Sequence, residues 1–541
     1  MQPPHLSRRA LLSGGGAAAA ALGLGGVAGA AEPAMLSGLA PGTLPSAAAL
    51  QREVRLMVEL GPRLPGSTPH NAFVDSLAGG FRSAGLRVTR DRHHFTRWAV
   101  RAKGLEILEG SRAGSVPVAS YYSYSGKTPP AGLVAPLVYA GPLPVPPAAA
   151  TLLDLSTAPT QVAAFAAELT AAVEALIAGV PGGIRGKVVL LEAPIAPLPL
   201  GTVYPLLTYA HDPGHTLSPT DDFKRAWTTL LTLPILAPLR AAGAAGVVFS
   251  LDASPANAKG QYTPFIWEYQ DLPALIVDRR AGAVLRQAAS TSPRVRLTLD
   301  ASLTPDTPSD SLVAVLPGSS TTREALIVHT HTDGQNAFEE NAGIALVALA
   351  RHFSRGGRSP LRRTLVFSCV SGHFAAELPE TSGFIKDHPD LVDRAAAQLT
   401  LEHLGSTEWV DDETGYHPTG KVEPAFIFHS LTPIAKAGVD SLRAADLRRT
   451  LLLKPIGPFF FGVGAALHAA GVPSLAYISS PNYLLALQGK TGHLDKFSAP
   501  RMRREIAWSV DVLKRLDTMP AGVLKLGDST LYDALPLPSL P

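Results

Sequence analysis

The sequence predicts an α/β protein, organised as a three-layer αβα sandwich with a mostly parallel core sheet. Apolar runs of strand length alternate with longer stretches of helical periodicity, most clearly in residues 325–353 and 465–477. Chains that alternate in this way form a largely parallel sheet between layers of helices. The length of 541 residues and the hydrophobic content of 46% allow two or more sizeable cores.

Residues 1–30 have the order of features found in an export signal. Arg8 and Arg9 precede a Gly/Ala-rich run, and the small-residue site Ala28-Gly29-Ala30 follows. This order resembles a twin-arginine signal peptide, which implies a secreted or periplasmic protein. A disordered basic tail is the alternative. The run is too short and too weakly apolar to predict a stable membrane span.

The next part of the chain, residues 50–88, carries a helical stripe of apolar side chains. The segment GPRLPGS interrupts the stripe at residues 61–67. It resumes at Phe73, Leu77 and Phe81, which are spaced by four residues, and a glycine stops it at position 85. We therefore expect a helix after the GPRLPGS segment.

Residues 133–300 have a different pattern. Strand-like runs at 186–191, 247–249 and 272–277 stand among proline-rich stretches. Dense proline predicts long surface loops between these strands.

The most informative stretch begins at residue 331 and reads HTDGQNAFEENAGIALVALARHF. His331 and Asp333 follow a short apolar run, at the strand end where open α/β sheets bind ligands. His331 could bind a cation through one ring nitrogen while Asp333 accepts the other N–H. Glu340 supplies a carboxylate just before the predicted helix. Its alternative role is to place negative charge, beside Glu339, at the helix N-terminus.

This stretch resembles the di-zinc exopeptidases of metallopeptidase family 28, which include aminopeptidases and glutamate carboxypeptidases. Their pattern is His-x-Asp and then Asp-Asn-x-x-Gly, and here His331-Thr332-Asp333 is followed by Glu340-Asn341-Ala342-Gly343. The GPRLPGS segment also resembles the opening of these enzymes. The resemblance implies that His331 binds zinc and that Glu340 takes the place of the carboxylate that bridges two zinc ions.

The downstream motifs depart from the family pattern at two positions. His373 aligns with the general base and Phe374 with a zinc ligand, and phenylalanine cannot bind zinc. Glu402 aligns with a carboxylate ligand. Gln488 aligns with the last histidine ligand, while His493 lies nearby but out of register. Each of the two family zinc sites would thus lose one ligand, and a catalytic zinc usually keeps three.

We therefore expect at most one ion, zinc or a similar divalent metal, held by His331, Glu340, Glu402 and His373. His373 would be the base or a fourth ligand, and Asp333 would orient His331.

Several of these side chains also have plain structural readings. His373 could be a core histidine beside Phe374, and Glu402 with His403 could be a polar strand end that faces solvent. His493 could belong to the start of a helix. His329 is expected to be a packed neighbour of His331, on the same face of the strand.

The resemblance also implies a domain organisation. A signal peptide spans residues 1–30, an exopeptidase domain comprises residues 45–132 and 308–520, and a tail follows at 521–541. A β-rich insert, similar to a protease-associated domain, is expected at residues 133–300.

The implied function is that of an exported metal-dependent exopeptidase of the aminopeptidase type. It would hydrolyse a terminal peptide bond or a similar amide with a metal-activated water. A catalytically inactive relative that binds peptides or other ligands in the old cleft is the alternative, and a scaffolding protein is least favoured.

The composition limits the classes of partner and the covalent cross-links that can be expected. The formal charge of +3 falls to about +1 without the two arginines of residues 1–30, so no nucleic-acid partner is expected. Cys369 is the only cysteine, which excludes an intrachain disulfide and predicts a buried packing role. No feature of the sequence indicates an oligomeric state.

Overall fold

The computed structural model describes residues 35–36, 43–143, 158–227, 235–262, 268–430, 432–455, 460–487 and 491–525. The predicted export signal at residues 1–30, Gln488 and most of the predicted tail lie outside these ranges. No helix within the described ranges is long and apolar enough to cross a bilayer.

The centre of the main sheet is formed by parallel strands. They lie side by side in the order β11 (Thr364–Val370), β10 (Ala325–His331), β12 (Ala395–Glu402) and β17 (Ser474–Ser479). Every residue of β10 and β12 is buried, as expected for strands covered on both faces. The sheet continues through β15 (Ala425–His429), β16 (Thr450–Leu453) and β6 (Leu207–His211).

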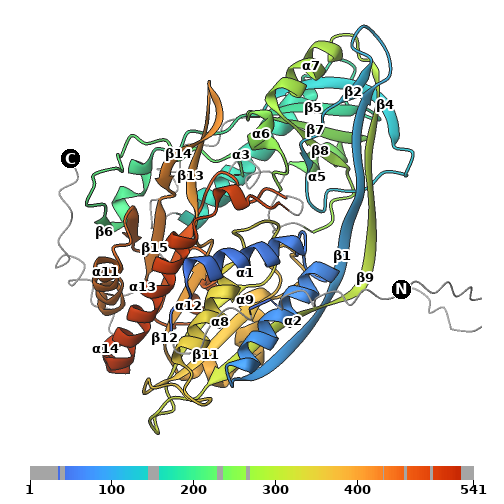
Figure 1. Cartoon of the computed structure of the whole chain (residues 1–541). Coiled ribbons are helices and arrows are strands. Elements are labelled where there is room, and N and C mark those ends of the chain that lie inside the picture. The colour runs from blue at the N-terminus through green and yellow to red at the C-terminus, as the bar shows by residue number, and fades with distance from the viewer. Residues whose placement is uncertain are drawn as a thin grey trace, which may run out of the picture. The chain divides into compact units, whose positions relative to one another are not determined.

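Helices cover both faces of this sheet (Figure 1). Leu326 and Val328 of β10 share a core with the first helical layer, and the alternate residues Ala325 and Ile327 share one with the second. The first layer contains α1 (Ala47–Glu59), α2 (Thr68–Ser83), α8 (Ala342–Phe353), α11 (Thr432–Ala445), α13 (Ala499–Thr518) and α14 (Ala521–Leu524). The second contains α9 (Glu380–Asp387), α10 (Pro389–Asp393) and α12 (Ala465–Ala469). The predicted αβα sandwich is confirmed.

Helix α2 forms where the spacing of Phe73, Leu77 and Phe81 predicts it. All three side chains are fully buried. The helix begins after Ser67, whose hydroxyl accepts a hydrogen bond from the N–H of His70 as an N-cap. The GPRLPGS segment is thus the loop between α1 and α2, and the main chain of its Arg63 pairs with that of Gly334 in the loop after β10.

A second group of parallel strands lies in residues 133–300. β4 (Leu133–Pro142), β5 (Val188–Ala193), β7 (Gly246–Leu251) and β8 (Ala274–Val277) are neighbours in the sheet. Successive residues of β5 belong to different cores, one shared with α3 (Ala158–Ala178) and α5 (Leu236–Ala241) and the other with α7 (Arg279–Ala289). This segment therefore contains helices on both faces as well as strands.

Residues 133–300 and the rest of the chain also pair through strands of one another. β3 (Ser120–Tyr121) precedes residue 133 but pairs with β8, whereas β6 pairs with β16 of the main sheet. The long strands β1 (Arg87–Ile107) and β9 (Arg294–Leu316) form a ribbon that joins both parts in one 15-stranded sheet (Figure 1). The remaining elements are β2 (Gly114–Val116), η2 (Leu200–Leu206), α6 (Pro255–Ala258), β13 (Thr407–Asp412), β14 (Gly415–Val422) and η3 (Leu494–Lys496).

Candidate metal centre

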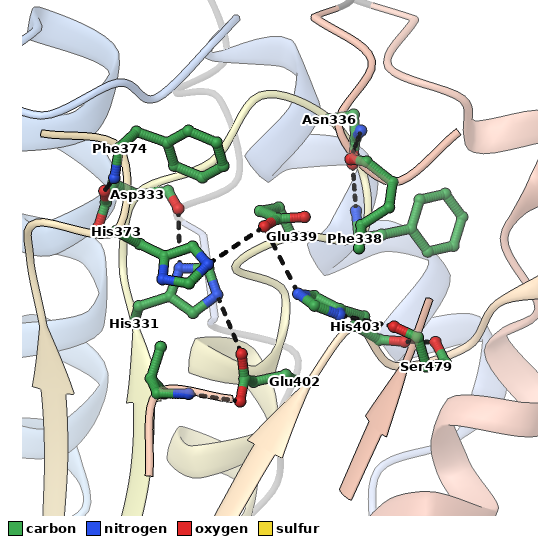
Figure 2. Close-up of polar contacts among 12 residues, drawn as sticks. His331, Asp333, Asn336, Phe338, Glu339, His373, Phe374, Glu402, His403 and Ser479 are labelled. Carbon is green, nitrogen blue, oxygen red and sulfur yellow. Dashed lines mark hydrogen bonds and ion pairs between the residues drawn. The ribbon is translucent and has the colours of Figure 1, made fainter. Parts of the chain in front are cut away.

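Ionisable side chains gather at the carboxyl edge of the main sheet, where β10 and β12 end side by side (Figure 2). His331 is the last residue of β10 and Glu402 is the last residue of β12. The loop after β10 contributes Glu339, the loop after β11 contributes His373, and His403 follows Glu402 directly. Figure 2 shows these five side chains, here called the His/Glu cluster, pointing toward one another.

The distances within the His/Glu cluster are close to those around a metal ion. The Nε2 atoms of His373 and His403 each lie 3.6 Å from Oε1 of Glu339. Nε2 of His331 lies 4.0 Å from Oε2 of Glu402. Ligands about 2.0–2.2 Å from a tetrahedral ion are separated by roughly 3.3–3.6 Å. A small contraction of the cluster would therefore complete a coordination shell.

The three histidines are held with Nε2 facing the centre of the cluster. Each donates Nδ1–H to a fixed acceptor: the main-chain oxygen of Asp333 at 2.9 Å for His331, the main-chain oxygen of Ser479 at 2.6 Å for His403, and the carboxylate of Glu380 at 2.7 Å for His373. A carbonyl oxygen can only accept, so Nδ1 of His331 and of His403 must carry the proton. The Nε2 lone pairs are then free to bind a cation.

Polar atoms at the centre lack partners in the described parts of the chain. Nε2 of His331, Nε2 of His403 and Oε2 of Glu339 are buried and make no hydrogen bond there. A buried polar atom without a partner costs about 1–3 kcal/mol. A divalent cation would satisfy these atoms, and its charge would balance the carboxylates of Glu339 and Glu402. The residues present therefore fit a metal ion.

Burial and mutual charge shift the ionisation of the cluster. Burial, with the neighbouring His373 and His403, holds the pKa of His331 well below its usual value. Burial raises the pKa of the Glu402 carboxyl. Burial also opposes protonation of His373, but its hydrogen bond to Glu380 and the nearby carboxylates outweigh that effect and raise its pKa to about 9. The ionisation of the three imidazoles is therefore coupled, because they face the same buried carboxylates.

The structure does not place Glu340, a predicted ligand, in either group of potential ligands among the described residues, and it brings Glu339 into the cluster instead. Glu340 accepts a hydrogen bond from Nε of Arg63, and the two side chains are 0% and 1% exposed. A buried guanidinium requires a carboxylate partner, and Glu340 provides it. The only sequence signal for this pairing is the arginine of the GPRLPGS segment.

Asp333 contacts His331 differently from the prediction. Its main-chain oxygen, and not its carboxylate, accepts the Nδ1–H of His331. The carboxylate accepts hydrogen bonds from the main-chain N–H groups of Gly372 at 3.1 Å and Phe374 at 2.7 Å. Asp333 therefore fixes the loop that carries His373.

The alternative reading of Glu402 and His403 as a polar strand end that faces solvent does not fit His403, whose side chain is only 3% exposed. The residue adopts a left-handed conformation, with φ of 59°, and this turn directs the imidazole into the cluster. No local pattern in the sequence signals that turn. A histidine directly after the carboxylate at a strand end is the one available cue.

The other predicted positions lie outside the cluster. Nε2 of His329 lies 2.9 Å from the hydroxyl of Thr381, as expected for a packed neighbour. The ring of Phe374 packs against that of Tyr262, with the two ring centroids 6.0 Å apart. His493 precedes η3 and belongs to neither group of potential ligands found in the described residues.

The loop that carries Glu339 is fixed by neighbouring residues. Nδ2 of Asn336 donates to the main-chain oxygens of Tyr483, Leu484 and Ala486. At Gly334 a Cβ atom would lie 1.9 Å from Oε2 of Glu340 and 2.7 Å from Cβ of Glu339. Only glycine leaves room for both glutamates at this turn.

Solved structures of peptidases share this fold. A family M28 peptidase precursor from Shewanella amazonensis has a TM-score of 0.58 at 16% identity, over 87% of this chain and 96% of that chain. The zinc aminopeptidase of Bacillus subtilis has a TM-score of 0.53 at 14% identity, over 88% and 98%. An aminopeptidase from Aneurinibacillus has a TM-score of 0.51 at 15% identity, over 86% and 93%.

These identities show similarity of fold. No protein-family model and no curated protein matches the sequence. The zinc-exopeptidase fold implied by the sequence motifs is confirmed.

Proposed function

We propose that this chain is a metal-dependent hydrolase that cleaves terminal peptide bonds, or similar amides, with a single divalent ion. The observation that carries the proposal is the convergence of three imidazoles on Glu339 and Glu402, each with its Nδ1 hydrogen-bonded to an acceptor outside the cluster. The shared fold of solved zinc aminopeptidases supports the same reaction class.

The ion would be held by His331, Glu339, Glu402 and His403. Two groups of potential ligands can be drawn among the described residues, and His331 belongs to both. Its Nδ1 is occupied by a carbonyl, so it has one lone pair and can bind one ion. This supports a single site. Mixed nitrogen and oxygen ligands suit zinc or a similar divalent metal.

A bound ion would polarise the substrate carbonyl and lower the pKa of a water molecule to roughly 7. His373 is placed to act as the base, because its side chain is 12% exposed while the other four are at most 3% exposed. Glu380 holds its Nδ1, as a carboxylate orients a catalytic histidine. The charge of a bound ion would lower the pKa of His373 from about 9, so that Nε2 would be unprotonated and could take a proton from water as the water oxygen bonds to the carbonyl carbon. Nε2 would then pass the proton to the leaving nitrogen as the C–N bond breaks.

The proposal extends to the rest of the chain. Residues 1–30 would direct export by the twin-arginine route, and residues 133–300 would act as a protease-associated-like insert beside the cleft. Tyr262 of that segment packs against Phe374, next to the proposed base, and supports the second assignment.

Metal analysis of the purified protein, paired with hydrolysis of a peptide panel, tests the proposal. We expect about one ion per chain in the wild type. His331→Ala and His403→Ala should lose both the ion and activity. His373→Ala should keep the ion and lose roughly 10²–10⁴-fold in rate. His417→Ala, an exposed histidine on β14, serves as the matched control and should change neither quantity.

Two stoichiometric ions would overturn the single site, and loss of the ion in His373→Ala would make His373 a ligand. A non-catalytic, ligand-binding relative is the second candidate, favoured by the near-complete burial of four of the five side chains. One bound ion without turnover of any peptide would select it.

A further inference from the structure

An aromatic cavity of about 230 Å³ lies beside the His/Glu cluster. Its rings come from strand β1, from the segment around β3, from the insert and from the loop after β11: Trp98, Tyr121, Tyr124, Tyr262 and Phe374. They form a continuous series, with centroid separations of 5.6 Å for Trp98–Tyr121, 5.8 Å for Tyr121–Tyr262 and 6.0 Å for Tyr262–Phe374. We call this cavity the aromatic pocket.

The aromatic pocket borders the proposed reaction centre. Phe374 is the residue after His373, and the centroids of the two rings are 5.4 Å apart. The ring of His373 in turn stacks on that of His331 at 4.2 Å. A substrate group in the pocket would therefore lie next to the C–N bond whose cleavage His373 would assist.

One charged side chain, Arg97, lines the aromatic pocket. Arg97 is half-buried, and within the described ranges its guanidinium makes no ion pair or hydrogen bond. Three other arginines of β1 are paired: Arg90 and Arg92 with Asp310, and Arg101 with Asp300. A bulge between Phe95 and residue 97 breaks the strand register there, and bulges redirect side chains.

One residue of the aromatic pocket also has an unusual backbone conformation. Tyr124 has φ of 52°, in the left-handed region that bulky residues rarely adopt. Such strain persists where the surrounding structure enforces it, and it is concentrated at ligand sites.

We infer that the aromatic pocket binds the C-terminal residue of the substrate, with its side chain against the rings and its α-carboxylate on Arg97. A guanidinium pairs with a carboxylate through two parallel hydrogen bonds, and the low polarity around it strengthens that pair. Pockets for drug-sized ligands usually hold about 300–1,000 Å³, so the smaller cavity suits a single amino-acid residue. The substrate class is then dipeptides or N-acyl amino acids that end in an aromatic residue with a free carboxylate.

Binding of a ligand without a cleavable bond tests the pocket separately from catalysis. The probes are 3-phenylpropanoate and the uncharged 3-phenylpropanamide, measured by calorimetry on the whole protein. The wild type should bind the carboxylate more tightly, and Arg97→Ala should weaken that binding roughly ten- to hundredfold while leaving the amide unchanged. Arg101→Ala removes a paired arginine from the same strand and should have no effect. Equal binding of both probes to the wild type would overturn the inference.

The choice of substrate rests on the proposed function, and a second measurement separates the two. The dipeptide Ala-Phe should be cleaved in preference to its C-terminal amide, and Arg97→Ala should raise KM for Ala-Phe alone. Carboxylate binding without hydrolysis would refute the proposed function and keep the pocket. Hydrolysis without a preference for the free carboxylate, or a preference for an acidic side chain, would refute the pocket and keep the function.

Discussion

Replacing Arg63 by methionine should lower the free energy of unfolding by about 3–5 kcal/mol, the usual cost of removing one partner from a buried ion pair. The side chains of Arg63 and Glu340 are 1% and 0% exposed, so the remaining carboxylate would stay buried without its partner. Arg63 also donates to the main-chain oxygens of Met57, Gly61 and Asn336, which would lose those bonds. Methionine retains the apolar stem, so the loss would report mainly on the polar contacts.

Urea unfolding of Arg63→Met, Glu340→Gln and the double variant would measure this effect. Domains are commonly stable by about 5–15 kcal/mol, so the single variants should still fold. Because the double variant removes both charges, it should lose less than the sum of the two single losses. Arg92→Met is the control, since Arg92 is 60% exposed in its pair with Asp310 and exposed ion pairs contribute little to stability.

A loss below about 1 kcal/mol for Arg63→Met, or strict additivity in the double variant, would refute this reasoning. The same variant should also bind metal more weakly than the wild type, because the ion pair fixes the residue next to Glu339. Unchanged metal affinity would mean that Glu339 is positioned without Arg63.

Further outcomes follow from the placement of the loop residues. Glu339→Gln should lose the ion and Glu340→Gln should keep it, and metal analysis that finds the reverse would restore the ligand set predicted from the sequence. Gly334→Ala should lower the metal content, because the added Cβ would lie 1.9 Å from a carboxylate oxygen of Glu340. Full metal occupancy in this variant would show that the loop can rearrange to accommodate the Cβ. Replacing Arg8 and Arg9 by lysine should retain the protein in the cytoplasm, as cell fractionation would show, and unchanged secretion would contradict the export proposal.

The fold could be predicted from the sequence because the apolar patterns that indicate its strands and helices are local. Strand β10 and helix α8 are each marked by an apolar run, and every residue of the strand is buried. The spacing of Phe73, Leu77 and Phe81 places α2 for the same reason, since each helical turn repeats the apolar position. The end of an apolar strand singles out His331, and the resemblance to the family motif singles out Glu402. The two side chains lie 4.0 Å apart.

The identity of the remaining ligands depends on contacts that no local pattern contains. Glu339 and Glu340 are adjacent, and which of them faces the cluster is decided by Arg63, 277 residues away in the chain. His403 enters the cluster through a left-handed turn, and its Nδ1 is fixed by a carbonyl 76 residues away. A residue-by-residue match to a family motif cannot reveal the choice between Glu339 and Glu340 or the turn at His403.

Phe374 is one of the two positions that depart from the family pattern, and it affects both the metal site and the aromatic pocket. The motif places a zinc ligand at this position, and a phenylalanine there removes one ligand from a second metal site. Its ring instead closes one wall of the aromatic pocket, while its main-chain N–H anchors to Asp333 and sets the position of His373. His403 adds a nitrogen ligand beside Glu402. In the proposed one-metal hydrolase, Phe374 would therefore have two effects: it would remove a ligand from a second metal site, and it would supply an aromatic surface beside the remaining ion.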